Sequence, residues 1–591
     1  MTRKFLSLAT FSLLAAVAAG CGDDTSNEGD GAVNPGVDGA VNPDVDGAVN
    51  PDVDGGRTPA DVTDAPPLPD FPDGSVGIVV DGTKTVSATG GDDLTVRPYR
   101  AAAAFVQRPY SFPTYASLLS KAHFKSIRGV NVDNGCNVVS GKRIDWMTAC
   151  GGNVFFDAWI QSCIKGGFTP YLIAGQALPS GMTGTYDVWT PGQKDQYQTY
   201  LNALVETVVT LSPTGITRVA FGNEAELDVN EQWLFADGAK DPWALSRYEG
   251  YRAPSLQLWK AVQLARTNHP DKTVEFYGMQ SNYDAYFGGD YGKPPAGHTD
   301  GSTAIMDYCV WAKSVGMVLD GRDIHVYDDP LDFGAGRDSM NSIFHQVIQV
   351  KEWLKANGHG TKIIVGEYGL MEPIGGRKAP AMYDDHRDAT QMVVLMKEVM
   401  DASGAEVFTL DLEDLAGSQT SADPISGPSL VHVVGNKDGS YTPGGPFTMF
   451  PKPSLAAGLL AEIGLNGVRK LVDVVGNTDV NGIASTSSTE ASVLLYNWNL
   501  GPEYVDQTVE RRVEVHMIGL TFSGARTADR TIIDSTHGNL NALLAAGTTL
   551  TDDNTKGQLV ESLPVTVDAA GRVVLPLRAM GKSSVTLWRV H

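Results

Sequence analysis

Two glutamates, Glu224 and Glu367, each stand where a short apolar run ends. The runs Ile216–Glu224 and Lys362–Glu367 are rich in β-branched residues and have the length of a strand. In a (β/α)8 barrel the reacting groups gather at the C-terminal ends of the strands, so residues far apart in the sequence become neighbours. One carboxyl group of such a pair can act as a general acid and base, and the other as a nucleophile. The sequence therefore predicts a two-carboxylate site at one end of a barrel.

Hydrolysis of a glycosidic bond is a reaction that fits this pair. The bond breaks through an oxocarbenium-like transition state, which needs one acid at the leaving oxygen and one carboxylate facing the anomeric carbon. Asn223 carries an amide that can hydrogen-bond a sugar hydroxyl, while His325 and Tyr327 are two residues apart on a predicted strand and share a face. We interpret these three as substrate-binding residues. Glu226 is the alternative to Glu224 as the acid.

Three further charged residues belong to the candidate site. Arg128 lies inside a predicted strand, where a lone buried charge would be costly, so we expect it to pair with a site carboxylate and to hold Glu367 ionised. Asp411 and Glu413 follow the last predicted barrel strand and either contact sugar hydroxyls or pair with a neighbouring arginine. No metal or organic cofactor is expected, because the sequence has neither a zinc-binding His-Glu-x-x-His motif nor a P-loop.

The elements that would position these residues begin after Gly74. Short apolar strands alternate with amphipathic helices, which is the pattern of an α/β fold with a parallel sheet. We expect a (β/α)8 TIM barrel, whose poorly marked first strand lies between Val76 and Val106. The other predicted strands are Phe124–Val132, Thr169–Ala174, Ile216–Glu224, Val274–Gly278, Asp323–Tyr327, Lys362–Glu367 and Glu406–Asp411. The predicted helices cover residues 115–123, 155–164, 196–211, 253–269, 305–315, 338–357, 389–400 and 453–463.

The last part of the chain changes to short strands separated by turns, which is typical of an antiparallel β-sandwich. The predicted strands there cover residues 472–475, 492–498, 512–516, 574–577 and 584–588. We therefore expect a barrel domain over residues 75–465 and a β-sandwich domain with a structural role over residues 466–591.

The first 74 residues are predicted to serve export and attachment. Residues 1–21 have the form of a signal peptide, and their end, Val17-Ala-Ala-Gly-Cys21, resembles the bacterial lipoprotein signal. Cys21 would then carry a lipid anchor; the alternative is an ordinary cleaved signal peptide. Residues 22–74 contain the octad GAVNPGVD once and GAVNPDVD twice, so we expect a disordered Gly/Asp/Pro-rich linker. The predicted location is the bacterial cell envelope, at the outer membrane or cell surface, or the secreted fraction.

Composition limits the possible partners. The 591 residues include 45 Lys and Arg against 69 Asp and Glu, a formal net charge of −24 that opposes binding to nucleic acid. Four cysteines remain besides Cys21, and outside the cytoplasm an even number favours disulfides. Three connectivities are possible for Cys136, Cys150, Cys163 and Cys309, with Cys136–Cys150 as the local pairing.

Taken together, these motifs resemble the clan A glycoside hydrolases, and most of all family 39. In that clan an Asn-Glu pair at the end of strand four supplies the acid/base, and a Glu at the end of strand seven supplies the nucleophile. Asn223-Glu224 matches the first motif, and Glu367 within Val-Gly-Glu-Tyr-Gly matches the second. The resemblance covers most of residues 121–591 and also includes Gly166–Pro179, His325-Val-Tyr327, Leu494–Trp498 and Ile533–Asn539.

The resemblance implies a retaining glycoside hydrolase that cleaves extracellular oligo- or polysaccharide, with a xyloside-like substrate favoured. Its two glutamates would lie about 5 to 5.5 Å apart and act by double displacement. Gly222 and Ala225 flank Asn-Glu where the family usually has Trp and Pro. The alternative is therefore a catalytically inactive carbohydrate-binding or structural surface lipoprotein.

Overall fold

The structure is a computed structural model of the chain. It describes residues 70–86, 101–103, 118–122, 124–129, 154–175, 179, 182–223, 249–282, 304–326, 329–368, 385–409, 430–434, 448–477, 479–501 and 505–591. The predicted signal peptide, almost all of the linker, Cys136 and Cys150 lie outside these residues.

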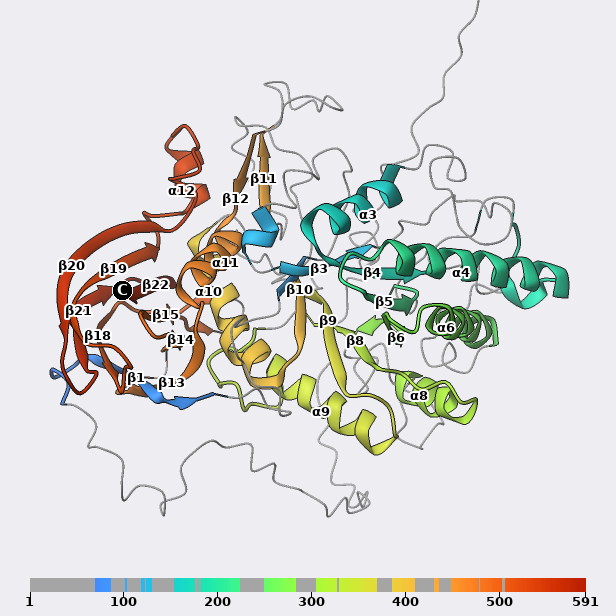
Figure 1. The fold of residues 1–591 in the computed structure, drawn as a ribbon, viewed down its shortest axis with the longest axis horizontal. Coiled ribbons are helices and arrows are strands. Elements are labelled where there is room, and N and C mark those ends of the chain that lie inside the picture. The colour runs from blue at the N-terminus through green and yellow to red at the C-terminus, as the bar shows by residue number, and fades with distance from the viewer. Residues whose placement is uncertain are drawn as a thin grey trace, which may run out of the picture. The chain divides into compact units, whose positions relative to one another are not determined.

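A parallel sheet of nine strands forms the framework of the first domain (Figure 1). Its order is β6-β5-β4-β3-β2-β10-β9-β8-β7, and every pair in it is parallel. The strands are β2 (Ala101–Ala103), β3 (Phe124–Gly129), β4 (Thr169–Ala174), β5 (Ile216–Phe221), β6 (Thr273–Met279), β7 (Ser281–Asn282), β8 (Gly321–His325), β9 (Lys362–Tyr368) and β10 (Glu406–Thr409). Only Gln280 separates β6 from β7, the two ends of the sheet, so the sheet closes into a ring apart from this single residue.

Helices follow the strands in alternation, as the sequence predicted, and Figure 1 shows them outside the strands. They are α3 (Val154–Gly166), α4 (Pro191–Leu211), α6 (Glu249–Asn268), α8 (Ala304–Ser314), α9 (Ile343–Ala356), α10 (His386–Val394) with a π-helical segment (Leu395–Asp401), and α11 (Pro453–Gly464). The start of α4 shows how the local sequence sets a boundary. Thr190 and Gln193 form a capping box, and Pro191 occupies the first helical turn, where its missing N–H costs no hydrogen bond.

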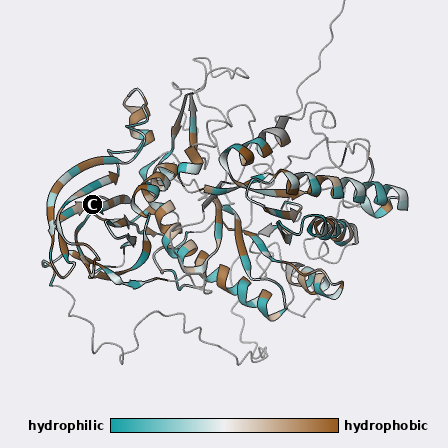
Figure 2. Cartoon of the chain, viewed as in Figure 1, coloured by the Kyte–Doolittle hydropathy of each residue, from teal (hydrophilic) through white to brown (hydrophobic). Residues whose placement is uncertain are grey.

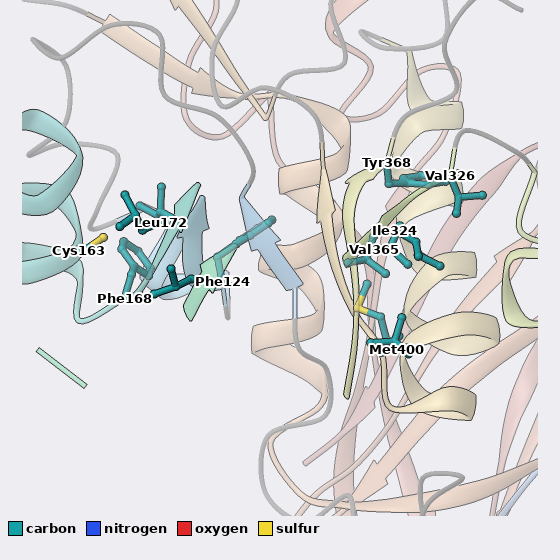
Figure 3. Packing of buried hydrophobic residues seen from close by; sticks show 14 of the residues in the cluster. Phe124, Cys163, Phe168, Leu172, Ile324, Val326, Val365, Tyr368 and Met400 are labelled. Carbon is teal, nitrogen blue, oxygen red and sulfur yellow. The ribbon is translucent and has the colours of Figure 1, made fainter. Parts of the chain in front are cut away.

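The strands bury one face inside the ring and the other against the helices. Tyr171, Ile173, Ala220, Tyr277, Ile364 and Phe408 form the inner cluster. The neighbouring residues Leu172 and Val365 belong to the outer core, as expected from the period of two in a strand. Figure 3 shows this outer packing, with Leu172 near Phe168 and Val365 near Met400. Figure 2 shows hydrophobic and hydrophilic residues alternating along the covering helices, as amphipathic helices require.

The second domain is built on one continuous nine-stranded sheet, in the order β20-β19-β22-β15-β14-β13-β1-β18-β21. Its strands are β1 (Val76–Thr85), β13 (Val468–Val475), β14 (Val480–Thr486), β15 (Ala491–Asn497), β18 (Arg511–Ile518), β19 (Gly524–Ile533), β20 (Gln558–Val567), β21 (Val573–Met580) and β22 (Ser584–Val590). Smaller pairs join β11 (Val431–Val434) to β12 (Thr448–Pro451) and β16 (Leu500–Gly501) to β17 (Val505–Asp506), and a short helix, α12, covers Leu540–Ala545.

Strand β1 requires a correction to the predicted domains. The sequence predicted a barrel domain from residue 75 onwards, but β1 pairs antiparallel with β13 and parallel with β18. Its side chains Val76, Ile78 and Val80 are buried in the core of the second domain, which explains the pairing. The strand that joins the barrel sheet in the predicted interval is β2.

The predicted two-sheet sandwich is not confirmed. All nine main strands of the second domain belong to a single hydrogen-bonded sheet. Its edge strands β20 and β21 approach each other closely enough for Arg578 Nε to donate to Glu561 Oε2 over 2.9 Å. The sheet therefore curves around its core, which includes Val515, Leu575 and Trp588.

Two of the four cysteines available for disulfides are described. Cys163 in α3 and Cys309 in α8 are both buried, and Cys163 is a free cysteine. Burial raises the pKa of the Cys163 thiol well above its usual value, which favours the uncharged thiol. Across the described part of the chain, no helix is both long and apolar enough to cross a membrane.

Candidate active site

Glu367 lies near the C-terminal end of β9, where a bulge sets its direction. Val365 is in register with Ile324 of β8, but Glu367 is in register with the very next residue, His325, so β9 carries one extra residue at Gly366. Without this extra residue, strand alternation from the inward Ile364 would turn Glu367 away from the interior. The bulge therefore brings the carboxylate inward, and only 8% of Glu367 is exposed.

Gly366 is required by a close approach. A Cβ at this position would overlap the Asp323 carboxylate on the neighbouring strand β8. The backbone of β9 thus comes directly against a second buried acid. Only glycine leaves room for that acid beside Glu367.

Arg128, on β3, is fully buried and is the centre of the hydrogen-bond network. Its Nη1 donates to Glu367 Oε1 over 2.6 Å. Its Nη2 donates to Gln280 Oε1 over 2.8 Å and to Asn223 Oδ1, and lies 3.3 Å from His325 Nε2. Burial opposes the charge of Arg128, but the attraction of the surrounding carboxylates outweighs it and raises the pKa of the guanidinium above its usual value. The structure thus brings four predicted site residues, Asn223, His325, Glu367 and Arg128, to one place.

The imidazole of His325 lies between two carboxylates. Its Nδ1 is 3.6 Å from Glu367 Oε2, and its Nε2 is 3.7 Å from Asp323 Oδ1. Because a guanidinium only donates, the approach of Arg128 to Nε2 favours the tautomer in which Nε2 accepts and the Nδ1 proton faces Glu367. His325 is completely buried, so its orientation is fixed by these neighbours.

Asp323 is a site residue that the sequence analysis missed. Its Oδ2 accepts hydrogen bonds from the Tyr171 hydroxyl and from Gln280 Nε2. Burial, reinforced by the Asp323 charge, raises the pKa of Tyr171 well above its usual value, which keeps the hydroxyl proton available for this bond. One signal was available, because Asp323 precedes His325 by two residues and must share its face of β8.

Gln280, also missed, is directed inward by a second irregularity. Gly278 has a φ of 70°, and the register between β5 and β6 shifts there. This left-handed glycine interrupts the strand just before Gln280, whose amide bridges Arg128 and Asp323 and lies 3.0 Å from the Tyr171 hydroxyl. No pattern of apolar residues signals such a bulge.

Several predicted site residues lie outside the described part of the chain. They are Glu224, Tyr327, Asp411, Glu413, the alternative acid Glu226 and the predicted lipid-carrying Cys21. Asn223, the residue before Glu224 in the sequence, is described, and its Oδ1 accepts a hydrogen bond from Arg128.

The opposite end of the barrel is closed by a different charged cluster. Arg218 on β5 contacts Glu406 at 2.6 Å and Glu275 at 3.3 Å, and Lys362 also pairs with Glu275. These cations lower the pKa of Glu275 against the effect of its burial. In a barrel of this kind the N-terminal end serves stability, so this cluster is best understood as structural.

The described residues place the Glu367 carboxylate at the C-terminal end of the barrel strands, the end where barrels of this kind carry their active sites. Glu367 is held by the permanently charged Arg128, and Tyr171 and Gln280 donate to one oxygen of the second acid, Asp323. Such a carboxylate is suited to attack, or to stabilise, a carbon that develops positive charge.

Comparison with known proteins addresses the fold. No family model and no curated protein matches this chain. Among solved structures, the GH39 enzyme from Xanthomonas axonopodis pv. citri is 13% identical, with 87% of this chain and 97% of that chain covered and a TM-score of 0.59. A monomeric β-xylosidase from Caulobacter crescentus CB15 is 14% identical, with 87% and 99% covered and a TM-score of 0.57. A bacterial orthologue of human α-L-iduronidase is 13% identical, with 87% and 83% covered and a TM-score of 0.55.

Each alignment covers 87% of the whole chain, which is more than either domain alone, so these similarities extend into both domains. At such low sequence identity, these matches show similarity of fold and nothing further. The predicted resemblance is confirmed at that level: the protein has the TIM-barrel fold of the clan A glycoside hydrolases, with a GH39 enzyme among its matches.

Proposed function

We propose that this protein is a retaining glycoside hydrolase in which Glu367 is the nucleophile and Glu224 is the acid and base. The observation that carries the proposal is the ion pair of the buried Glu367 with Arg128 at the C-terminal end of the barrel strands. Active sites of such barrels lie at this end. A carboxylate kept charged and turned inward there is what a double displacement requires.

The mechanism follows from these assignments in two steps. In the first, Glu367 attacks the anomeric carbon while Glu224 gives its proton to the leaving oxygen, which produces a glycosyl-enzyme ester and a free alcohol. In the second, Glu224 takes a proton from water, the resulting hydroxide equivalent attacks the same carbon, and the Glu367 carboxylate leaves. Asn223, held by Arg128, would donate its amide N–H to the sugar 2-hydroxyl.

For the substrate we propose an extracellular oligo- or polysaccharide, with a xyloside-like sugar favoured. The β-xylosidase among the structural matches supports this choice by analogy of fold. Tyr327, Asp411 and Glu413 would contact sugar hydroxyls from the strand ends. We further propose export through the predicted signal peptide, with attachment to the membrane by lipid on Cys21.

A panel of aryl glycosides tests the activity. The purified protein should release the aryl group from at least one sugar, and Glu367→Gln and Glu224→Gln should each lower the rate by about 10⁴-fold or more. Glu352→Gln, at a side chain that is 67% exposed on α9, is the matched control and should leave the rate unchanged. Proton NMR of the first sugar released should show the anomeric configuration of the substrate.

The outcomes separate the proposal from its alternative. Undiminished turnover by Glu367→Gln would remove Glu367 from the mechanism. Sugar binding without turnover by the unaltered protein, with affinity retained by Glu367→Gln, would establish a carbohydrate-binding protein in its place.

A further inference from the structure

A tryptophan of the second domain contacts a loop that belongs to the barrel. Trp498 directly follows β15, and its Nε1 donates a hydrogen bond to Asp329 Oδ1 over 3.1 Å. Both residues are removed from water, with Asp329 fully buried and Trp498 2% exposed. The backbone N–H of Trp498 is itself fixed by the carbonyl of Asp479, 2.8 Å away. A buried hydrogen bond to a charged group, held on a rigid sheet, is a strong anchor.

The anchored segment is the loop from Asp329 to Ser342, which begins four residues after the end of β8 and leads into α9. Asp329 Oδ2 accepts from the backbone N–H of Phe333 over 2.9 Å, so the same carboxylate that binds Trp498 also holds the loop closed. Asp332 and Phe333 have φ angles of 47° and 49°, a left-handed conformation that is unfavourable for a bulky residue. Such a conformation persists only when its surroundings impose it.

A second contact of the same strand reinforces the first. Arg337, in the loop, lies 3.6 Å from Glu398 of the π-helical segment, and Glu398 accepts from the Tyr496 hydroxyl over 2.7 Å. Tyr496 near the end of β15 and Trp498 directly after it are two residues apart, and both belong to the same buried cluster as the barrel core. The second domain therefore holds the loop at its beginning and along its length.

The anchor is close along the chain to the candidate active site. Asp329 follows His325 by four residues, and the backbone N–H of Val326 donates to the carbonyl of Glu367 over 3.2 Å. A shift of the loop would therefore act on the strand end that carries His325 and on its register with Glu367.

From these contacts we propose that Trp498 is a positioning residue for the active site: through Asp329 it holds the end of β8, and so the orientation of His325 against Glu367. The second domain then contributes to the geometry of the active site and not only to the stability of the fold. This inference rests on the proposed glycosidase function. Displacement of reacting groups by about 1 Å is enough to cost on the order of 100-fold in rate, so a remote anchor can matter to turnover.

The test compares two Trp→Phe changes in the full-length protein. Trp498→Phe removes the N–H donor and keeps an aromatic ring, whereas Trp588→Phe makes the same change in the core of the second domain, away from the loop. With an aryl glycoside that the unaltered protein hydrolyses, Trp498→Phe should lower kcat about tenfold or more with KM within about threefold, since the binding groups remain. Trp588→Phe should leave kcat within about twofold.

A second pair of variants tests the acceptor and covers the case in which Trp498→Phe does not fold. Asp329→Asn keeps one acceptor oxygen for Trp498 but loses the acceptor for the Phe333 N–H, so it should retain clearly more turnover than Asp329→Ala, which should resemble Trp498→Phe. Equal kcat for Trp498→Phe and Trp588→Phe, or for Asp329→Asn and Asp329→Ala, would overturn the proposal.

Hydrogen–deuterium exchange separates this inference from the proposed function. If the unaltered protein hydrolyses no glycoside, the proposed function fails, and the exchange of amides in 321–342 still reports on the anchor. Faster exchange there in Trp498→Phe than in Trp588→Phe would support the coupling of the domain to the strand end. Identical exchange in the two variants would refute it.

Discussion

The most consequential residue in the candidate site is Arg128, because it serves several acceptors at once. One nitrogen holds Glu367, and the other is shared among Asn223, Gln280 and the edge of His325. A guanidinium has five donors in a rigid plane, whereas a lysine ammonium is a compact point charge on a flexible stem. Conservation of charge alone would therefore not reproduce this network.

Arg128→Lys tests that statement. The variant keeps the positive charge but cannot reach Glu367, Asn223 and Gln280 together, so we expect kcat/KM for an aryl glycoside to fall by about 100-fold or more. Arg512→Lys, at an exposed arginine of β18, is the control and should have no effect. Retention of more than about a third of the activity by Arg128→Lys would mean that charge, and not geometry, is what the site needs from this residue.

Some residues of the candidate site could be predicted from the sequence, and others could not. Glu367, His325 and Arg128 could be located because each lies on a recognisable strand. Gln280 could not be located, since it lies in a break between two strands that hydrophobic periodicity does not show. Asp323 was overlooked as part of an apparently buried strand, although a charge in such a strand is itself informative.

At the scale of single elements, the bulge in β9 couples two acids. Gly366 gives Glu367 its inward direction and at the same time makes room for Asp323. The Asp323 carboxylate is fixed by Tyr171 and Gln280, so it cannot simply swing away from a new side chain.

Gly366→Ala should therefore displace Asp323 or straighten the bulge. We expect a loss of kcat of about tenfold or more, together with a lower melting temperature, because a methyl group must enter a filled interior. Gly192→Ala in α4, where a Cβ would have open space, is the matched control and should change neither quantity appreciably. Steady-state kinetics and thermal unfolding of the two variants provide the comparison. Unaltered kinetics of Gly366→Ala would show that the bulge does not position the site.

The stability of the protein is expected to depend on pH through Asp329, in the loop that precedes α9. Burial raises the pKa of Asp329 to about 6, against the opposing hydrogen bonds from Trp498 and Phe333, and Asp332 adds to the rise by repulsion. A carboxyl group with a raised pKa binds its proton more tightly in the folded state than in the unfolded state. Its contribution to stability is thus fully present below about pH 4 and is lost as the pH rises through about 6.

Asp329→Asn removes this titration. The free energy of unfolding of the unaltered protein, minus that of the variant, should fall by roughly 2 to 3 kcal/mol between pH 4 and pH 7. Asp401, whose pKa burial also raises to about 6, is present in both proteins and cancels in the difference. Denaturant unfolding at several pH values supplies the curves. Parallel curves would show that Asp329 does not titrate in this range.

Most elements could be predicted because their apolar periodicity is strong. Thr169–Ala174 has the boundaries expected from the sequence, the helix beginning at Pro453 ends one residue later than expected, and other barrel elements differ by a few residues at their ends. Strands β19 and β20 were missed because they carry many polar residues and are largely partly or fully exposed, which leaves no apolar run to detect. Their pairing with the rest of the sheet, and not their own composition, makes them strands.

At the scale of the whole molecule, the position of β1 decides which part of the N-terminal region is dispensable. This strand lies between β13 and β18 and buries Val76, Ile78 and Val80. A chain that begins at Pro66 keeps the complete described unit. A chain that begins at Ser87 lacks β1, so β13 and β18 each lose one of their two neighbouring strands in the sheet.

We expect the chain from Pro66 to be soluble and to unfold cooperatively on heating. The chain from Ser87 should be insoluble or lack a thermal transition, because two ladders of hydrogen bonds and a row of core side chains are lost together. Circular dichroism during heating distinguishes the two. A stable, cooperative fold from Ser87 would show that the barrel and the remaining strands do not depend on β1.

The pairing of β1 with β13 also has a consequence for how the chain reaches its fold. Val79 faces Asp473 across this ladder, so the whole barrel sequence lies inside a loop that β1 and β13 close. During synthesis or export, β1 emerges first and must wait for almost the entire chain before its partners exist. Contacts this distant in sequence form late and slowly. A truncated chain can therefore contain every barrel strand and still leave β1 unpaired. An unpaired strand exposes backbone hydrogen-bonding groups and apolar side chains, which proteases and chaperones recognise.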